Sequence, residues 1–317
     1  MKVGWQWLGS LRLTVGVLPL LVAGAWYAMA TGTSPTWVLV GPFTLFAINL
    51  GVALAMTPAL RQQTALFVFH LALLGMVGLL LVSRLTYLKG VVEITTGSFF
   101  EGALLQEEQG PWHPGALSGI RWRNIGFEID YAPGLTRGKT RNQVEWWDGM
   151  QWQQHTIGDD QPLVVSGYRF YTTSNKGFAP FFLWKPVEKR EASAGGVHLP
   201  GYPAAMVPIS TWTIPGTAMT GEIELRLDEK LADLERAWQL RLPVAHHLIL
   251  AMPSGTYSLR PGEHVDLPEG RLLYQGLQFW MGYRVLYDET RPWLLAAALL
   301  ASISLALHFW QKFRVPQ

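Results

Sequence analysis

Residues 65–82 read ALFVFHLALLGMVGLLLV, and this stretch decides how the chain folds. It contains no Lys, Arg, Asp or Glu. A hydrocarbon core about 30 Å thick is crossed by about 20 apolar residues in helical form, so this run is close to the required length. One ionisable side chain, His70, interrupts it. The stretch therefore predicts a transmembrane helix that carries an imidazole.

Three further apolar stretches, residues 13–30, 37–56 and 293–310, also lack charged side chains and predict three more spans. The whole chain agrees with this, because only 15% of its residues are charged, against roughly 25% in soluble proteins. The first stretch is long for the core of a signal peptide, and we expect it to be a retained span.

The distribution of basic residues predicts the orientation of these spans, because Lys and Arg concentrate in cytoplasmic loops. The basic residues near the span ends that fall on one side are Lys2, Arg12, Arg61, Lys312 and Arg314. The short loop 31–36 on the other side carries none, and Arg84 and Lys89 at the outer end of the third span are the minority that runs against the rule. We therefore expect both termini in the cytoplasm and residues 86–290 on the outer side of the membrane. The expected location is a bacterial inner membrane with this segment in the periplasm, and the charge pattern alone leaves a thylakoid lumen open as the outer space.

The outer segment predicts a mainly antiparallel β domain, because short alternating apolar runs are separated by Gly and Pro. The strands we expect are residues 120–131, 144–147, 152–157, 163–172, 181–184, 222–227, 247–251, 257–259 and 272–287. Residues 228–240 show helical spacing, and residues 188–217 are predicted to form a loop. The prediction is two small sheets or a sandwich, giving domains at 1–85, 86–290 and 291–317.

Several classes of function are excluded by composition. The chain has no Cys, which rules out disulfides, zinc–thiolate sites, iron–sulfur clusters and covalent haem attachment through C-x-x-C-H. A net charge of only +2 gives no bulk attraction to nucleic acid. No nucleophile motif, acid–base pair or phosphate loop is visible, so an enzyme acting alone is not expected.

His70 is the principal candidate site residue. It lies roughly 8 Å inside the cytoplasmic end of its span, where an ionisable side chain is costly and is by default a functional-site hypothesis. Imidazole is a usual axial ligand of haem iron. The structural alternative is a hydrogen bond to a neighbouring helix, for example through Asn49, and the residue alone does not decide between them.

His308 is the second candidate, at a similar depth in the last span and beside Phe309 and Trp310. If the third and fourth spans pack together, both imidazoles would reach one haem b from opposite sides. The simpler interpretation of His308 is an interfacial side chain next to an aromatic belt.

Several segments form a recognisable series along the chain: residues 8–14, Gly32-Thr33, His70 in the third span, Ser83-Arg84-Leu85, Lys89-Gly90, residues 157–171 and residues 276–288 before the last span. In this order they resemble the ResB family of cytochrome c biogenesis proteins. The chain is shorter than we expect for that family, and Asp160 stands where the family favours Asn.

The resemblance implies a function. ResB proteins pair with the multi-span protein CcsA, carry haem outward and present it to apocytochrome c, and the span-three His is taken as a haem ligand. This transfers to His70 alone. The alternative is an accessory or scaffold subunit of a membrane-bound electron-transfer complex, with or without a bound haem b, because a shortened relative can have lost the transport role.

Overall fold

The computed structural model describes residues 7–187 and 191–314. Four of its helices are long and apolar enough to cross a membrane, as predicted: α2 (Leu11–Thr31), α3 (Pro35–Met56), α5 (Thr64–Thr86) and α6 (Arg291–Arg314). Each extends the predicted span by one to four residues at one or both ends. A short helix, α4 (Pro58–Gln62), joins α3 to α5. The basic residue Lys2, used in the orientation argument, lies outside the described residues.

Local sequence explains where the first two long helices begin and end. The Ser10 hydroxyl accepts from the Leu13 amide and caps α2, while Gly32 ends the helix with φ of 67°, a left-handed conformation that favours glycine. Ser34 then caps α3, whose first residue is Pro35. The tight connection therefore brings α3 back alongside α2.

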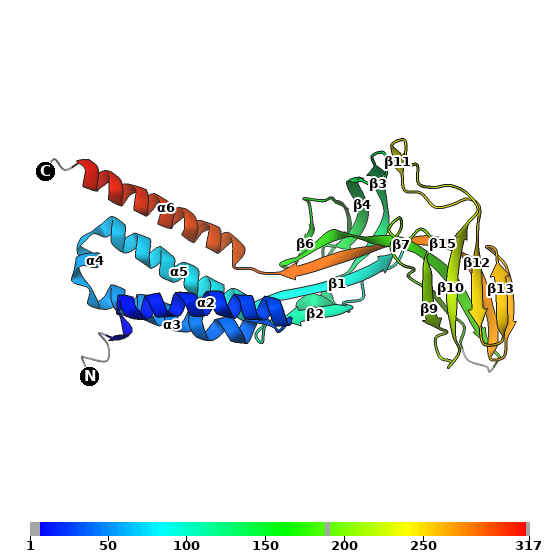
Figure 1. The fold of residues 1–317 in the computed structure, drawn as a ribbon, viewed down its shortest axis with the longest axis horizontal. Coiled ribbons are helices and arrows are strands. Elements are labelled where there is room, and N and C mark those ends of the chain that lie inside the picture. Colours follow the sequence, from blue (N-terminus) through cyan, green and yellow to red (C-terminus); the bar gives the residue numbers. More distant parts are fainter. Residues whose placement is uncertain (1–6, 188–190, 315–317) are drawn as a thin grey trace. The chain divides into compact units, whose positions relative to one another are not determined.

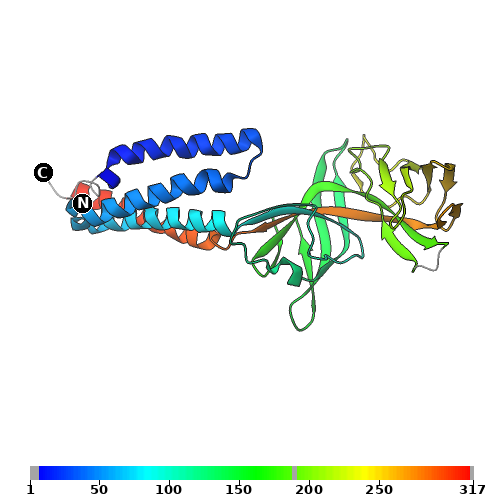
Figure 2. The same cartoon turned by 90° about the horizontal axis from the view of Figure 1, so that it is seen from below.

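The helical part is one compact unit that consists of the residues up to Lys89, residues 107–114 and the residues from Leu286 onward. In it α2 packs on α3, α3 on α5, and α5 on α6 (Figures 1 and 2). The start of α2, helix α4 and the end of α6 lie at the same end of this unit (Figure 1). The basic residues Arg12, Arg61 and Lys312 belong to these segments, so the helices gather them as the charge pattern predicts.

The second unit, residues 90–106 and 115–285, holds most of the β structure. The strands are β1 (Leu88–Thr95), β2 (Gln106–Gln109), β3 (Trp122–Tyr131), β4 (Arg137–Trp147), β5 (Trp152–Ile157), β6 (Leu163–Val165), β7 (Tyr168–Pro186), β8 (Ser193–Gly196), β9 (Ile209–Thr213), β10 (Thr220–Leu227), β11 (Trp238–Gln239), β12 (His246–Met252), β13 (Gly255–Leu259), β14 (His264–Leu267) and β15 (Gly270–Tyr287).

These strands form three sheets rather than the predicted two. The largest has the order β2-β1-β15-β7-β6, with β14 beside β15 and β8 beside β7. One four-stranded sheet has the order β13-β12-β10-β9, and the other the order β11-β3-β4-β5 (Figure 1). The sheet fold is antiparallel, as expected, and β7 and β15 are its longest strands.

Two local predictions were wrong in detail. Residues 163–172 are two strands, because Ser166 and Gly167, with φ of 48° and 82°, turn the chain between β6 and β7. The predicted loop 188–217 contains β8 and β9, while residues 188–190 lie outside the described residues. Strand pairing with partners distant in sequence orders these short segments, and local composition carries no sign of it.

The predicted helix at residues 228–240 is not formed. Leu231 is buried, but Leu234 is exposed, and Trp238 lies in β11 opposite Tyr131 of β3. The two rings stack with centroids 4.2 Å apart, and the Trp238 indole donates to the Gly134 carbonyl. These tertiary contacts override the helical spacing, which is only a weak preference.

Candidate functional site

His70 lies in α5, half-buried, with its ring edge-on to Phe69. Its Nδ1 is 2.8 Å from the carbonyl oxygen of Leu66, one turn earlier in the same helix. A carbonyl oxygen only accepts, so this hydrogen bond requires the proton on Nδ1. In the neutral ring Nε2 then carries a lone pair, which is the form that binds a metal.

Asn49 is not the partner of His70. Its side-chain amide donates to the carbonyls of Leu8 and Ser10, and its oxygen accepts from the Thr14 hydroxyl. Asn49 therefore joins the start of α2 to α3, and the interhelical bond considered for His70 from sequence is replaced by a bond within its own helix.

His308 lines a cavity of about 500 Å³ at the end of the helical unit that carries the basic residues. The other lining residues are polar: Gln62, Gln63, Thr64, Gln311 and Lys312. The ring of His308 also contacts Phe309 edge-on, at 5.5 Å between centroids. Amide and ammonium groups of this kind bind carboxylates, so the cavity has the chemistry of an acid-binding site.

The structure brings the helices of the two candidate ligands together, because α5 and α6 pack side by side. His308 shares its cavity with Thr64, whereas His70 is six residues farther along α5, a rise of about 9 Å. Two imidazoles that bind one iron at about 2 Å each must bring their nitrogens to about 4 Å. Their sharing of one haem stays a prediction.

A polar collar that sequence reasoning missed closes the opposite end of the helical unit. The Tyr87 hydroxyl, just after α5, donates to Glu108 at 2.6 Å and lies within hydrogen-bond distance of Ser34 and Thr36 at the start of α3. Burial, reinforced by the bond to Glu108, raises the pKa of Tyr87, so this hydroxyl stays a neutral donor. The collar ties residues 107–114 to the ends of two helices.

A second missed cluster lies in the β unit, where Glu93 and Thr95 of β1 flank one imidazole. The Nδ1 of His198 is 3.0 Å from Glu93 Oε2, and its Nε2 is 2.9 Å from the Thr95 hydroxyl. Asn175 holds the other oxygen of Glu93 at 2.9 Å. The ring of His198 lies flat on Trp280, with centroids 5.1 Å and planes 14° apart.

This carboxylate–imidazole–hydroxyl order is that of nucleophilic catalytic triads. A nucleophile must meet its substrate, however, and Thr95 is only 7% exposed. The cluster therefore acts as a polar clamp between β1 and the segment after β8. Among the described residues, no group of three or more His, Cys, Asp or Glu side chains has the arrangement of a metal site.

For the cluster around His198, the sequence contains one signal. Glu93 and Thr95 are two positions apart, which places both side chains on one face of an extended strand. Their partner His198 is 105 positions from Glu93, and the collar joins Tyr87 to residues 21 and 51 to 53 positions away. No local pattern predicts such pairings.

Comparison with known proteins adds the following. A family model described as the ResB-like family matches residues 59–225, more than half of the 317-residue chain. The matched region includes α5 with His70 and runs into β10. No curated protein matches the chain significantly.

A solved structure of "Cytochrome c Heme Lyase CcmF" aligns with 95% of this chain and 35% of its own length, at 14% identity and a TM-score of 0.28. The chain thus spans about a third of that protein, and a score this low carries no argument about fold. The family match extends over the third long helix and most of the strands of the β unit. The chain belongs to the ResB-like family.

Proposed function

We propose that this chain is a cytochrome c biogenesis protein that takes haem as cargo at the cytoplasmic side of the bacterial inner membrane. With a CcsA-like partner it helps carry or present the haem to apocytochrome c in the periplasm. Membership of the ResB-like family and four helices able to cross a membrane support this role. The β domain, outside the membrane in this proposal, docks the partner and the acceptor.

The observation that carries the proposal is the hydrogen bond from His70 Nδ1 to the Leu66 carbonyl. An imidazole among apolar side chains is costly unless its polar atoms are satisfied. Here the helix backbone satisfies Nδ1, which fixes the tautomer and turns the basic Nε2 toward a ligand. A backbone carbonyl behind the ligating ring is the usual support of a metal-bound histidine. His70 therefore fits the role of an axial ligand of haem iron.

His308 is proposed as the second ligand, with a His of the partner as the other source of that ligand. The Gln63 and Lys312 groups beside His308 are suited to hold the two carboxylates of a haem. The chain's own contribution is to bind, to orient the imidazole and to exclude water from the apolar span. Bound haem absorbs visible light, and this absorption reports its binding.

The test is a visible spectrum of the protein purified with its native partners, oxidised and dithionite-reduced, for wild type, His70→Ala and His308→Ala. We expect a b-type spectrum in the wild type and its loss in His70→Ala. His264→Ala, on the exposed surface of β14, is the matched control and should keep the spectrum. A wild type without haem, or an unchanged spectrum in His70→Ala, contradicts the role of His70.

The cavity beside His308 also supports a second candidate, an accessory subunit of an electron-transfer complex that keeps its haem, because it offers an internal second ligand. The two roles differ in whether the bound haem is released to another protein. A haem carrier should release haem to a haem-free acceptor protein added in excess, and its spectrum should decline as that of the acceptor grows. A retained haem, lost in both His variants and unaffected by the acceptor, favours the accessory role.

A further inference from the structure

Strand β8 is an open sheet edge. Its four residues, SAGG at 193–196, are all exposed, and among the described strands β8 pairs with β7 alone. The register sets Phe182 opposite Gly195 and Trp184 opposite Ser193. Natural proteins usually protect such an edge with Lys, Pro or a bulge. This four-residue strand has none of these, and its exposed residues leave its outer side accessible to another strand.

The pairing pattern shows which backbone groups face outward. The amides of Val197 and Leu199 donate to Pro180 and Phe178, so these residues face β7. Successive residues of an antiparallel strand alternate in direction. The N–H and C=O groups of Ala194 and Gly196 therefore point away from β7. Within the described residues no backbone hydrogen bond outside the sheet pairing uses them.

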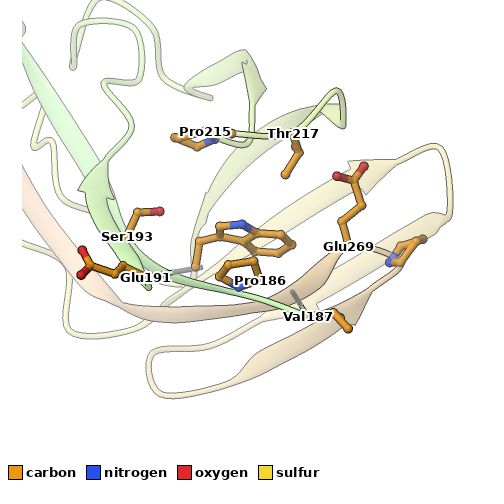
Figure 3. Close-up of a pocket in the computed structure, with 10 residues that line it drawn as sticks. Pro186, Val187, Glu191, Ser193, Pro215, Thr217 and Glu269 are labelled. Atoms are coloured by element: carbon orange, nitrogen blue, oxygen red, sulfur yellow. The ribbon is translucent and has the colours of Figure 1, made fainter. Parts of the chain in front are cut away.

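A cavity of about 540 Å³ lies at the start of this edge. Its lining includes Trp184, Glu191, Ser193, Thr217 and Glu269. Figure 3 shows Glu191 and Ser193 on one side of the cavity and Glu269 and Thr217 on the other. A smaller cavity of about 180 Å³ shares Trp184, Ser193 and Pro215 with it and continues along residues 193–197. The edge and the cavities therefore form one groove.

The acidic residues of the larger cavity indicate which kind of side chain it can bind. Among the described lining residues of the larger cavity two are acidic and none is basic. Trp184 also lines this cavity but is only 4% exposed, so the carboxylates are the groups that an incoming side chain would meet. Carboxylates at both sides favour a cation and repel an anion such as a haem carboxylate. The pair Glu191 and Glu269 is therefore complementary to a positively charged side chain.

We propose that the β8 edge binds an extended, cationic segment of a partner polypeptide. The segment adds to the sheet as a strand by bonding to the backbone of Ala194 and Gly196. One Arg or Lys side chain enters the cavity between Glu191 and Glu269. Backbone bonds give such strand addition its affinity, and the side-chain pocket gives its specificity. This site is independent of the haem ligands, because it uses none of the histidines.

The test uses the full chain in nanodiscs and a fluorescent peptide of alternating Thr and Val with one central Arg. We expect saturable binding by fluorescence anisotropy. Replacing the Arg by citrulline, its neutral analogue, should weaken binding by about two- to fivefold, the range that an exposed ion pair gives. Methylating alternate peptide amides should abolish binding, because it blocks strand pairing.

Matched variants locate the site. Glu191→Gln with Glu269→Gln should remove the preference for Arg over citrulline, while Glu235→Gln, an exposed acid outside the groove, should keep it. Ala194→Pro should abolish binding without lowering the melting temperature, because its amide faces away from β7 and Pro is tolerated there. His70→Ala should bind the peptide as the wild type does. The proposal is overturned if the Arg peptide does not bind the wild type. It is also overturned if the citrulline peptide and the methylated peptide bind as tightly as the Arg peptide.

Discussion

The indole N–H of Trp280 in β15 donates to the carbonyl oxygen of Leu199 at 3.0 Å, across 81 positions of sequence. The indole lies against Gly177 of β7 and beneath the ring of His198. This single side chain therefore joins two long strands to the segment that carries His198. It sets the position of the Glu93–His198–Thr95 clamp.

Gly177→Ala should destabilise the β unit. A Cβ at this position would lie 2.9 Å from Trp280 Nε1 and 3.1 Å from the Pro200 carbonyl oxygen. Crowding of a packed interior costs about 1–3 kcal/mol, so the melting temperature should fall. Gly195→Ala is the control, because a Cβ there meets no atom within 4 Å. Equal melting temperatures of the two variants would show that Trp280 has room to move.

Tyr87→Phe should weaken the collar of the helical unit. The variant keeps the ring, which Arg84 overlies at 5.9 Å, and removes the hydroxyl that donates to Glu108. A hydrogen bond to a charged group contributes about 1.5–3 kcal/mol, so unfolding should require correspondingly less denaturant. Glu108→Gln and the double variant complete a cycle. Strictly additive effects would mean that the two side chains do not stabilise each other.

The β unit should lose stability in mild acid through His246. This residue is 8% exposed, its Nε2 is 2.8 Å from the Tyr274 hydroxyl, and burial lowers its pKa below the ordinary 6.5. Above pH 6.5 the ring is neutral in both the folded and the unfolded chain, so stability is full. As the pH falls below 6.5, the unfolded chain takes up the proton first, and stability declines down to the lowered pKa.

Melting curves of wild type and His246→Gln between pH 7.5 and pH 5 check this, values that bracket the ordinary histidine pKa of about 6.5. The amide of Gln can still bond to Tyr274 but does not titrate, so the slope with pH should diminish. An unchanged slope in His246→Gln would assign the acid sensitivity to another group.

Sequence predicted what local rules control. Span length and the absence of charge located all four long helices, and alternation located β5 at Trp152–Ile157 without error. It failed where a distant partner decides. The 228–240 segment has Leu231, Leu234 and Trp238 at helical spacing. Trp238 nevertheless lies in a strand, because it pairs with Tyr131 of β3 and the two rings stack. Short edge strands such as β8 have too few residues for a period to appear.

Some features of the candidate site were predictable from the sequence and others were not. His70 was identifiable because a single imidazole in an apolar run is conspicuous, but its bond to Leu66 needs coordinates. His198 has no such contrast with its surroundings, and it lies beside Glu93 only because the fold brings together positions 105 residues apart. The acidic residues of the cavity, Glu191 and Glu269, come from segments 78 positions apart. No local pattern in either segment predicts that the two lie close together.

The proposed orientation predicts the access of reagents from the outside of the cell. The chain has no Cys, so single Cys substitutions report one position each with a membrane-impermeant maleimide. Met150→Cys, at the β4–β5 turn and 87% exposed in the wild type, should be labelled in cells whose outer membrane is permeabilised. Gln62→Cys, at the end of α4, should be labelled only after the inner membrane is disrupted.

Both positions are exposed, so a difference between them measures the side of the membrane rather than burial. Lys312→Cys, at the end of α6, provides a second cytoplasmic position that is reached through a different helix. It should behave as Gln62→Cys does, because the charge pattern places both ends on one side. Labelling of Gln62→Cys from outside, with protection of Met150→Cys, would reverse the orientation and move His70 to the outer leaflet. Haem would then meet this imidazole after crossing the membrane, and the carrier role assigned to His70 would fail even if the spectrum confirmed a ligand.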